Sequence, residues 1–530
     1  MRSRVTIDSG VLDGVPGRDR SVTVFRGIPY AAAPVGELRW RAPQPVAPWT
    51  GVRSAARFGP MCPQAPQDAA SAGIELPLSE DCLHLNVWTA AESAADRLPV
   101  LVWIYGGGFR AGTGANPRFD GERLARKGVV VVTFNYRLGV FGFLATPELS
   151  AESEQHASGN YGLLDCVALL DWVQRNIAAF GGDAGRVTIA GQSAGAGAVN
   201  FLAMSPPARG LFHRAIAQSH ARYPGDPELR YLSTSYRTMA DAEQAGETFA
   251  REHGGGGLRR LRALPWRKLV DGHAGADESV DTASTAKPPL FRPVVDGYVL
   301  PRGYADTYRL GEQHDVGYLT GNNLDEGGSV PDSAFAEYRR TGAAPFRPGA
   351  PPVYVTRRDF LAAAQRKFGP MVADFLRLYP AGDDDQAARS AAAAARDNSR
   401  VSTDLWAGEW TRHATRGVFT YSWSHAAPVP GGGPRRAGHG SEIEFVFGNP
   451  APDAPQWTEE DRRVAATMSA YWVNFITRGD PNGPGLPRWP GYSADAHSVM
   501  ELGGRFAPQP VAGARQWQFW QRFFDTQKAW

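Results

Sequence analysis

Short apolar runs rich in β-branched residues recur between residues 98 and 425, and helical patterns separate several of them. The runs are LPVLVWIY (98–105), GVVVVTFNYR (128–137), RVTIAGQSAG (186–195), RAIAQS (214–219), DVGYLTGN (315–322) and GVFTYSWSH (417–425). The segment from Tyr161 to Ile177 has apolar residues at three- and four-residue steps, which predicts an intervening helix. This alternation is typical of an α/β fold with a mostly parallel sheet, helices on both faces and right-handed crossovers. We expect ligands at the carboxyl ends of the strands.

The rest of the chain indicates one large domain with insertions. The first 60 residues hold short strand patterns joined by turn residues, which predict an antiparallel edge of the sheet. Turn clusters at 224–227 and 254–257 flank a helix-like insertion and do not look like an interdomain linker. The Ala-rich tract from Ala381 predicts a solvated surface helix, and the aromatic stripe of the last helix predicts internal packing or a dimer contact. We expect a single domain, 1–530, in a monomer or homodimer.

Charge and hydropathy exclude several classes of protein. The net charge is +2, and the one local basic cluster, Arg435 with Arg436, is too small for a surface that follows nucleic-acid phosphates. No stretch reaches 18 uninterrupted apolar residues, so no membrane span is expected. The N-terminus shows no export signal, which favours a cytoplasmic location, with secretion left open if a leader was removed.

A serine stands in the sequence pattern of a nucleophile turn. Gly191, Gln192, Ser193, Ala194 and Gly195 follow the strand pattern VTIA and open an Ala/Gly-rich helical segment. Glycine two residues to either side lets a strained turn form and pushes the serine hydroxyl outward over the helix N-terminus. The N–H groups of that helix end can stabilise a developing oxyanion. We expect Ser193 to be a nucleophile.

Three successive glycines, Gly106 to Gly108, end the strand pattern LPVLVWIY. They let backbone N–H groups approach a substrate closely, as an oxyanion hole requires. The spacing of Gly106, Gly108 and Ala111 also fits a dinucleotide fingerprint. The turn-rich residues that follow cannot open the helix that such a site needs, so we reject the cofactor interpretation.

The sequence resembles the type-B carboxylesterase family, the cholinesterase-like branch of the α/β-hydrolases. The matching motifs are Phe180-Gly181-Gly182 with VTIAGQSAG, the segment Glu80 to Val87, GIPYAAAPVGELRWRAP from Gly27 and NYRLGVFGFL from Asn135. The resemblance covers essentially the whole chain. It implies the α/β-hydrolase fold, with a large mostly parallel sheet, an antiparallel N-terminal edge, helices on both faces and helical insertions around an active-site gorge. It also implies a serine carboxylesterase that needs no metal or cofactor.

The resemblance implies the acid and the oxyanion donors. In α/β-hydrolases the acid follows the serine along the chain, and GNNLDEG after DVGYLT matches the acid loop, which makes Glu326 the acid. Asp325 is the neighbouring candidate, although helix capping suits it better. Ser219 is a candidate partner for Glu326. The implied oxyanion donors are the backbone N–H groups of Gly107, Gly108 and Ala194.

His439 is the expected general base among eleven histidines. It follows the PGGGPRRAG loop and precedes GSEIEFVF, which resembles the histidine loop of the family. His84, inside a strand pattern, and His220, where the family usually has glycine, are the alternatives. The resemblance further implies a Cys62–Cys82 disulfide, leaves Cys166 as a buried thiol, and implies the ion pairs Arg39–Glu80 and Arg137–Asp165.

These residues predict ester hydrolysis through an acyl-enzyme. The alternatives are acyl transfer or lactone processing on a natural product, and a non-catalytic binding or adhesion relative. Gln192 replaces the glutamate that most often precedes the serine in the family. No tryptophan lies between Cys62 and Cys82, so the aromatic platform for a quaternary ammonium is missing and choline esters are disfavoured. We expect small to medium, uncharged ester substrates.

Overall fold

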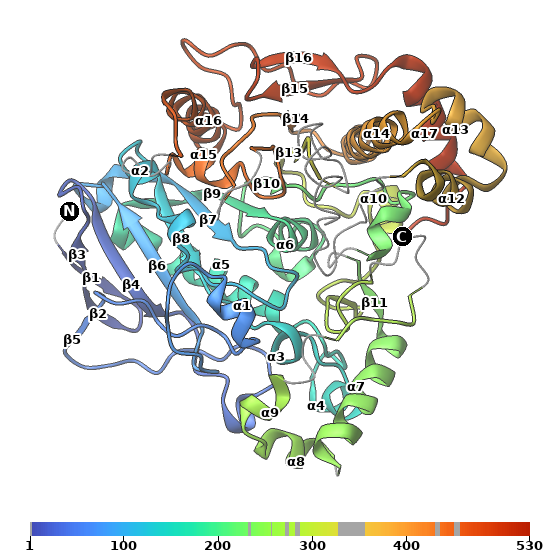
Figure 1. Ribbon diagram of the computed structural model, residues 1–530. Coiled ribbons are helices and arrows are strands. Elements are labelled where there is room, and N and C mark those ends of the chain that lie inside the picture. The colour runs from blue at the N-terminus through green and yellow to red at the C-terminus, as the bar shows by residue number, and fades with distance from the viewer. Residues whose placement is uncertain are drawn as a thin grey trace.

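A long twisted sheet forms the centre of the computed structural model, which describes residues 3–231, 235–255, 257–270, 275–280, 287–326, 356–429, 435–449 and 456–530 (Figure 1). Within those ranges the sheet has eleven strands. Their order is β16 (Ala507–Pro510), β15 (Ser498–Leu502), β14 (Val418–Trp423), β13 (Gly317–Asn323), β10 (Arg214–Gln218), β9 (Gly182–Gln192), β7 (Leu98–Ile104), β8 (Val130–Phe134), β6 (His84–Thr89), β4 (Thr23–Pro29) and β3 (Val15–Pro16).

The middle of this sheet is parallel and both ends are antiparallel. Strands β15 to β8 pair in parallel, whereas β6, β4 and β3 form the antiparallel edge that the N-terminal sequence predicts. This confirms the predicted fold class, the α/β-hydrolase arrangement. The antiparallel pairing of β16 with β15 at the other edge was not predicted. Two small sheets join β1 (Arg4–Ile7), β2 (Gly10–Asp13) and β5 (Val52–Ser54), and β11 (Arg237–Thr238) with β12 (Val294–Val295).

Helices cover both faces of the large sheet (Figure 1). Trp406 of the helix α14 (Asp384–Thr411) packs on Tyr318 of β13, and Trp472 of the helix α16 (Glu459–Arg478) packs on Tyr421 of β14. Tyr318 pairs with Val418, three positions before Tyr421, so the alternation of side chains along a strand puts the two tyrosines on opposite faces. The helices are α1 (Pro66–Ala70), α2 (Glu122–Ala125), α3 (Gly139–Phe143), α4 (Pro147–Glu152), α5 (Tyr161–Asn176), α6 (Ala194–Leu202), α7 (Met239–Gly254), α8 (Leu258–Ala263), α9 (Trp266–Val270), α10 (Tyr304–Leu310), α12 (Arg357–Phe368), α13 (Val372–Leu378), α14 (Asp384–Thr411), α15 (Ile443–Phe447), α16 (Glu459–Arg478) and α17 (Ala514–Asp525).

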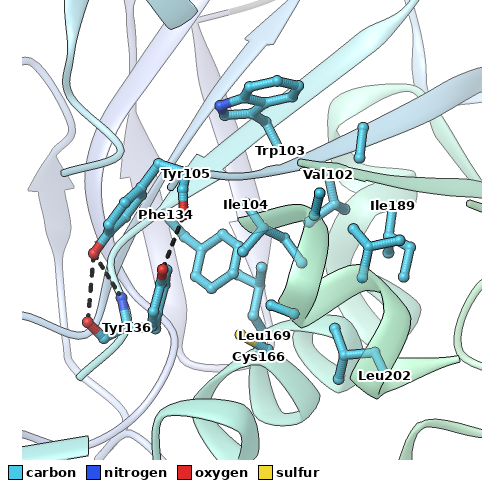
Figure 2. Close-up of a cluster of buried hydrophobic side chains, with 14 of the residues drawn as sticks. Val102, Trp103, Ile104, Tyr105, Phe134, Tyr136, Cys166, Leu169, Ile189 and Leu202 are labelled. Atoms are coloured by element: carbon cyan, nitrogen blue, oxygen red, sulfur yellow. Dashed lines mark hydrogen bonds between the residues drawn. The ribbon is translucent and has the colours of Figure 1, made fainter. Parts of the chain in front are cut away.

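The core beneath the expected site lies between β7, β8, β9, α5 and α6 (Figure 2). Ile104, Ile189 and Leu202 are buried there. Tyr105 and Tyr136 stack with ring centroids 4.6 Å apart, and the Tyr136 hydroxyl donates to the Tyr105 carbonyl at 2.9 Å. These contacts join the segment after β7 to the segment after β8, so the glycine turn that follows Tyr105 starts from a rigid base.

The Ala-rich tract forms a helix, as predicted, but it is not simply a solvated one. Asp383 caps α14 by accepting from Gln386 N at 2.7 Å, which satisfies an exposed N–H of the first turn. Ala387 and Ala388 are buried, because α12 and α17 pack against this helix. The aromatic residues of α17 fill this second core, and Trp520 donates to the Tyr379 hydroxyl at 2.9 Å. The aromatic stripe therefore serves internal packing.

Both ion pairs implied by the family resemblance are confirmed. Arg39 contacts Glu80 at 2.6 Å, and Arg137 contacts Asp165 at 2.7 Å, with all four side chains buried. Arg137 Nη1 also donates to the carbonyl of Arg41 at 2.8 Å. No helix in the described ranges is both long and apolar enough to cross a membrane.

The implied disulfide between Cys62 and Cys82 is wrong for this structure. Cys62, Cys82 and Cys166 are all buried free thiols. The hydrogen bond of the Cys82 thiol with Cys62, together with burial, raises the pKa of Cys82 well above its ordinary value, which disfavours the thiolate that disulfide formation needs. Backbone hydrogen bonds of Met61 with the carbonyl of Pro77 (2.9 Å) and the N–H of Ser79 (3.0 Å) close this loop without a covalent link.

Candidate active site

Ser193 sits in a sharp turn between β9 and α6. Its backbone has φ 60° and ψ −127°, a conformation that costs a non-glycine residue roughly 1–3 kcal/mol. A Cβ on Gly195 would lie 2.0 Å from the Ile104 carbonyl oxygen, so only glycine lets α6 start this close to β7. The local geometry is the strand, turn and helix that the sequence predicts for a nucleophile.

The glycine turn after β7 lies against Ser193. A Cβ on Gly106 would be 2.9 Å from the Ser193 Cβ. Gly107 has φ 115°, and a Cβ there would meet the Ala111 carbonyl oxygen at 2.2 Å. Among the described residues, none accepts a hydrogen bond from the backbone N–H of Gly107, Gly108 or Ala194. Three unused donors therefore stand near the serine, which suits stabilisation of an oxyanion.

Glu326 and His439 come together from the loops after β13 and β14. The distance from His439 Nδ1 to Glu326 Oε1 is 3.3 Å, and the same oxygen accepts from Ser219 Oγ at 2.5 Å and from Asn323 N at 3.3 Å. Burial raises the pKa of Glu326, but His439, the Ser219 hydrogen bond and Arg222 outweigh burial and lower this pKa below its ordinary value. The carboxylate is therefore ionised and fixes the orientation of the ring.

The surroundings of the His439 ring favour its charged form. Burial lowers the pKa of His439, but the Glu326 carboxylate and then Glu442 outweigh it and raise this pKa above 6.5, while Arg118 acts in the opposite direction. The outer side of the ring is open, with 52% of the side chain exposed. A raised pKa suits a histidine that accepts a proton from a neighbouring hydroxyl group.

No hydrogen bond joins the Ser193 hydroxyl to the His439 ring in the described part of the chain. The Nε2 of His439 instead lies 3.2 Å from the amide nitrogen of Gln192, the residue before the serine. Catalytic hydrogen bonds are often long in substrate-free enzymes and tighten when substrate binds. The structure thus brings Ser193 and the Glu326–His439 pair to one edge of the sheet without closing the contact between them.

Asp325, the alternative acid, contacts the histidine loop rather than the histidine ring. Its Oδ2 accepts from Ala437 N at 2.9 Å, its Oδ1 accepts from Arg396 Nη2 at 2.9 Å, and its own N–H donates to the Ala437 carbonyl at 3.0 Å. The backbone at this point forms an isolated parallel bridge between Asp325 and Gly438. Gly327, the last residue of the acid-loop motif, lies outside the described residues.

Sequence analysis missed a buried carboxylate behind the pair. Glu442 is fully buried and accepts from Gln218 Nε2 at 2.9 Å and from Asn323 Nδ2 at 2.5 Å. Burial raises the pKa of Glu442, although both hydrogen bonds oppose this rise. Glu442 stands three residues after His439 in the GSEIEFVF segment, and this short spacing was the one signal that could have pointed to it. Only the fold shows what it contacts.

Arg118, also missed, links the glycine-turn segment to the histidine loop. It forms a two-point ion pair with Glu444 at 2.8 Å for each bond and donates to the Gly440 carbonyl at 2.5 Å. The two alternative histidines lie elsewhere: His84 is in β6, 4.0 Å from Asp81, and His220 is buried with no hydrogen-bond partner for its Nε2 among the described residues. Among the described residues, no hydrogen bond or ion pair joins either histidine to Glu326.

Comparison with known proteins gives a consistent picture. A family model described as the carboxylesterase family matches residues 2–520. A fumonisin B1 esterase from Sphingopyxis macrogoltabida is 36% identical over 513 residues, which cover 94% of this chain and 86% of the relative. A medium-chain fatty acyl-CoA hydrolase precursor from Anas platyrhynchos is 34% identical over 543 residues, covering 96% and 90%. Carboxylesterase 3 from Homo sapiens is 33% identical over 545 residues, covering 97% and 88%.

Proposed function

This chain belongs to the carboxylesterase family and is a carboxylic-ester hydrolase, and we propose that Ser193, His439 and Glu326 are its nucleophile, general base and acid. One observation supports this assignment above the others. The strained Ser193 turn, three backbone N–H groups without acceptors, and the Glu326–His439 pair all follow parallel strands at their carboxyl ends. That edge is where open α/β sheets bind ligands.

The reaction proceeds in two halves. His439 Nε2 takes the proton of the Ser193 hydroxyl as Oγ attacks the ester carbonyl carbon, and the N–H groups of Gly107, Gly108 and Ala194 stabilise the oxyanion. The C–O bond to the alcohol breaks, and His439 gives its proton to the departing alkoxide. Water then attacks the acyl-enzyme with His439 as base, releasing the acid and restoring Ser193. Glu326 stabilises the imidazolium in both halves.

We further propose that the preferred esters are small to medium and uncharged. The two cations that act on the Glu326–His439 pair are already neutralised, because Arg118 binds Glu444 at 2.8 Å and Arg222 binds Asp226 at 2.9 Å. An anionic acyl or alcohol group therefore finds neither of these two arginines unpaired. The test is a panel of aryl esters with increasing acyl length, in which each ester is compared with one of similar size whose acyl chain ends in a carboxylate. The values of kcat/KM then measure the preference for size and the preference for charge.

Labelling tests the nucleophile directly. An organophosphate should modify one residue, Ser193, as peptide mapping by mass spectrometry will show, and Ser193→Ala should lower kcat about a millionfold. Ser205→Ala is a matched control, because Ser205 is a buried serine on the segment after α6 whose hydroxyl has no partner among the described residues. A label on another residue, or near-full hydrolysis by Ser193→Ala, would overturn the assignment.

A further inference from the structure

The side chain of Gln192 lies against the ring of His439. Its amide nitrogen is 3.2 Å from Nε2 and 3.5 Å from Nδ1 of the ring, and Gln192 itself is 94% buried. A Cβ on Gly440 would be 3.4 Å from the Gln192 amide oxygen, so the side chain is wedged between β9 and the histidine loop. We propose that Gln192 is a positioning residue whose neutral amide packs against the His439 ring and keeps a further negative charge away from it. This inference rests on the proposed role of His439.

The arrangement of groups around the ring shows what the Gln192 contact leaves available. Nδ1 faces the Glu326 carboxylate, which is acceptor-only, so the neutral ring carries its proton on Nδ1 and a lone pair on Nε2. The amide nitrogen of Gln192 is almost equally distant from the two ring nitrogens, so it packs against the face of the ring and does not lie along that lone pair. The contact therefore limits tilting of the ring without occupying the atom that has to accept the Ser193 proton.

Neutrality at residue 192 matters because the ring already faces two carboxylates. Glu326 approaches from the loop after β13, Glu442 from the residue before α15, and Arg118 opposes them from the segment after the glycine turn. A third carboxylate at 192, within about 4 Å of the ring, would stabilise the imidazolium further and raise the pKa of His439. The family most often has glutamate at this position. With glutamine instead, the His439 ring is neutral, and able to accept a proton, at lower pH than it would be with glutamate.

The test compares pH profiles of kcat/KM for the full chain and three variants, with an uncharged aryl ester as substrate. Gln192→Glu should move the acid limb upward by about one pH unit and lower kcat/KM roughly tenfold at pH values below the limb. Gln192→Ala removes the packing contact without adding charge, so it should lower kcat several-fold, leave KM within about twofold and move the limb far less than Gln192→Glu. Gln244→Glu adds the same charge on the exposed face of α7 and should change nothing.

Organophosphate titration of active sites normalises each rate to folded enzyme. An unmoved limb in correctly folded Gln192→Glu overturns the proposal, and so does unchanged kcat in Gln192→Ala. His439→Ala separates this failure from failure of the proposed function. If His439→Ala keeps wild-type activity and its acid limb, the base assignment itself is wrong. If activity is lost with His439 while the Gln192 variants behave as wild type, only the role of Gln192 fails.

Discussion

The hydrogen bond from Ser219 to Glu326 permits a quantitative prediction. Ser219 stabilises the fold through its hydroxyl group and destabilises it through a strained backbone conformation. Its Oγ donates to Glu326 Oε1 at 2.5 Å, and its φ is 63°. A hydrogen bond to a charged group contributes about 1.5–3 kcal/mol, and the left-handed backbone costs a residue with a Cβ about 1–2 kcal/mol. The two terms have opposite signs, so two substitutions separate them.

Ser219→Ala loses the hydroxyl and keeps the backbone strain, so it should lower the free energy of unfolding by about 2 kcal/mol. Ser219→Gly loses the hydroxyl but adopts the positive φ without cost, so it should be about 1 kcal/mol more stable than Ser219→Ala. Both variants leave the Glu326 carboxylate less firmly held, and both should lower kcat about tenfold at nearly constant KM.

Urea denaturation followed by tryptophan fluorescence measures the stability order, and hydrolysis of an aryl ester measures kcat and KM. The expected order of stability is wild type, then Ser219→Gly, then Ser219→Ala. The reasoning is refuted if Ser219→Gly shows no advantage over Ser219→Ala, since the strain is then absent. It is equally refuted if Ser219→Ala keeps wild-type kcat, since the hydroxyl then does not hold the acid.

Four further outcomes are expected. Gly107→Ala should lower kcat at least a hundredfold, because its Cβ meets a carbonyl oxygen at 2.2 Å and displaces an oxyanion donor; a mild effect would place the hole elsewhere. Wild-type kcat/KM should fall as pH drops through a value above 6.5, because the raised pKa of His439 leaves the ring protonated and unable to accept below it; a limb at or below 6.5 contradicts this sign. Asp325→Asn should cost about 2 kcal/mol of stability by breaking the pair with Arg396, with a smaller loss of kcat than Glu326→Gln causes; the reverse ranking would make Asp325 the acid. A thiol reagent added to denatured, unreduced protein should titrate all three cysteines, whereas one free thiol would mean that a disulfide forms.

The sequence predicted features whose physical cause is local. The glycines around Ser193 and after β7 are needed because a Cβ there would collide with nearby residues of the chain or with an adjacent strand. The sequence shows this requirement directly, because only glycine meets it. The six apolar runs became β7, β8, β9, β10, β13 and β14 because near-continuous β-branched segments are stable mainly in a sheet buried on both faces. From that parallel order it follows that the loops bearing Ser193, Glu326 and His439 meet at one edge.

Tertiary structure alone decided the rest, because the deciding contacts join residues that are far apart in the chain. Asp325 and Glu326 are adjacent carboxylates in an extended segment, where successive side chains point in opposite directions. The β-bridge with Gly438 turns Asp325 toward Ala437 and leaves Glu326 facing His439, and no local signal sets that choice. The same holds for Gln192, whose contact with His439 spans 247 positions. A site feature that lies within one turn can therefore be predicted from the sequence. The partner of a side chain from a distant loop is known only from the folded structure, because the sheet brings those loops together.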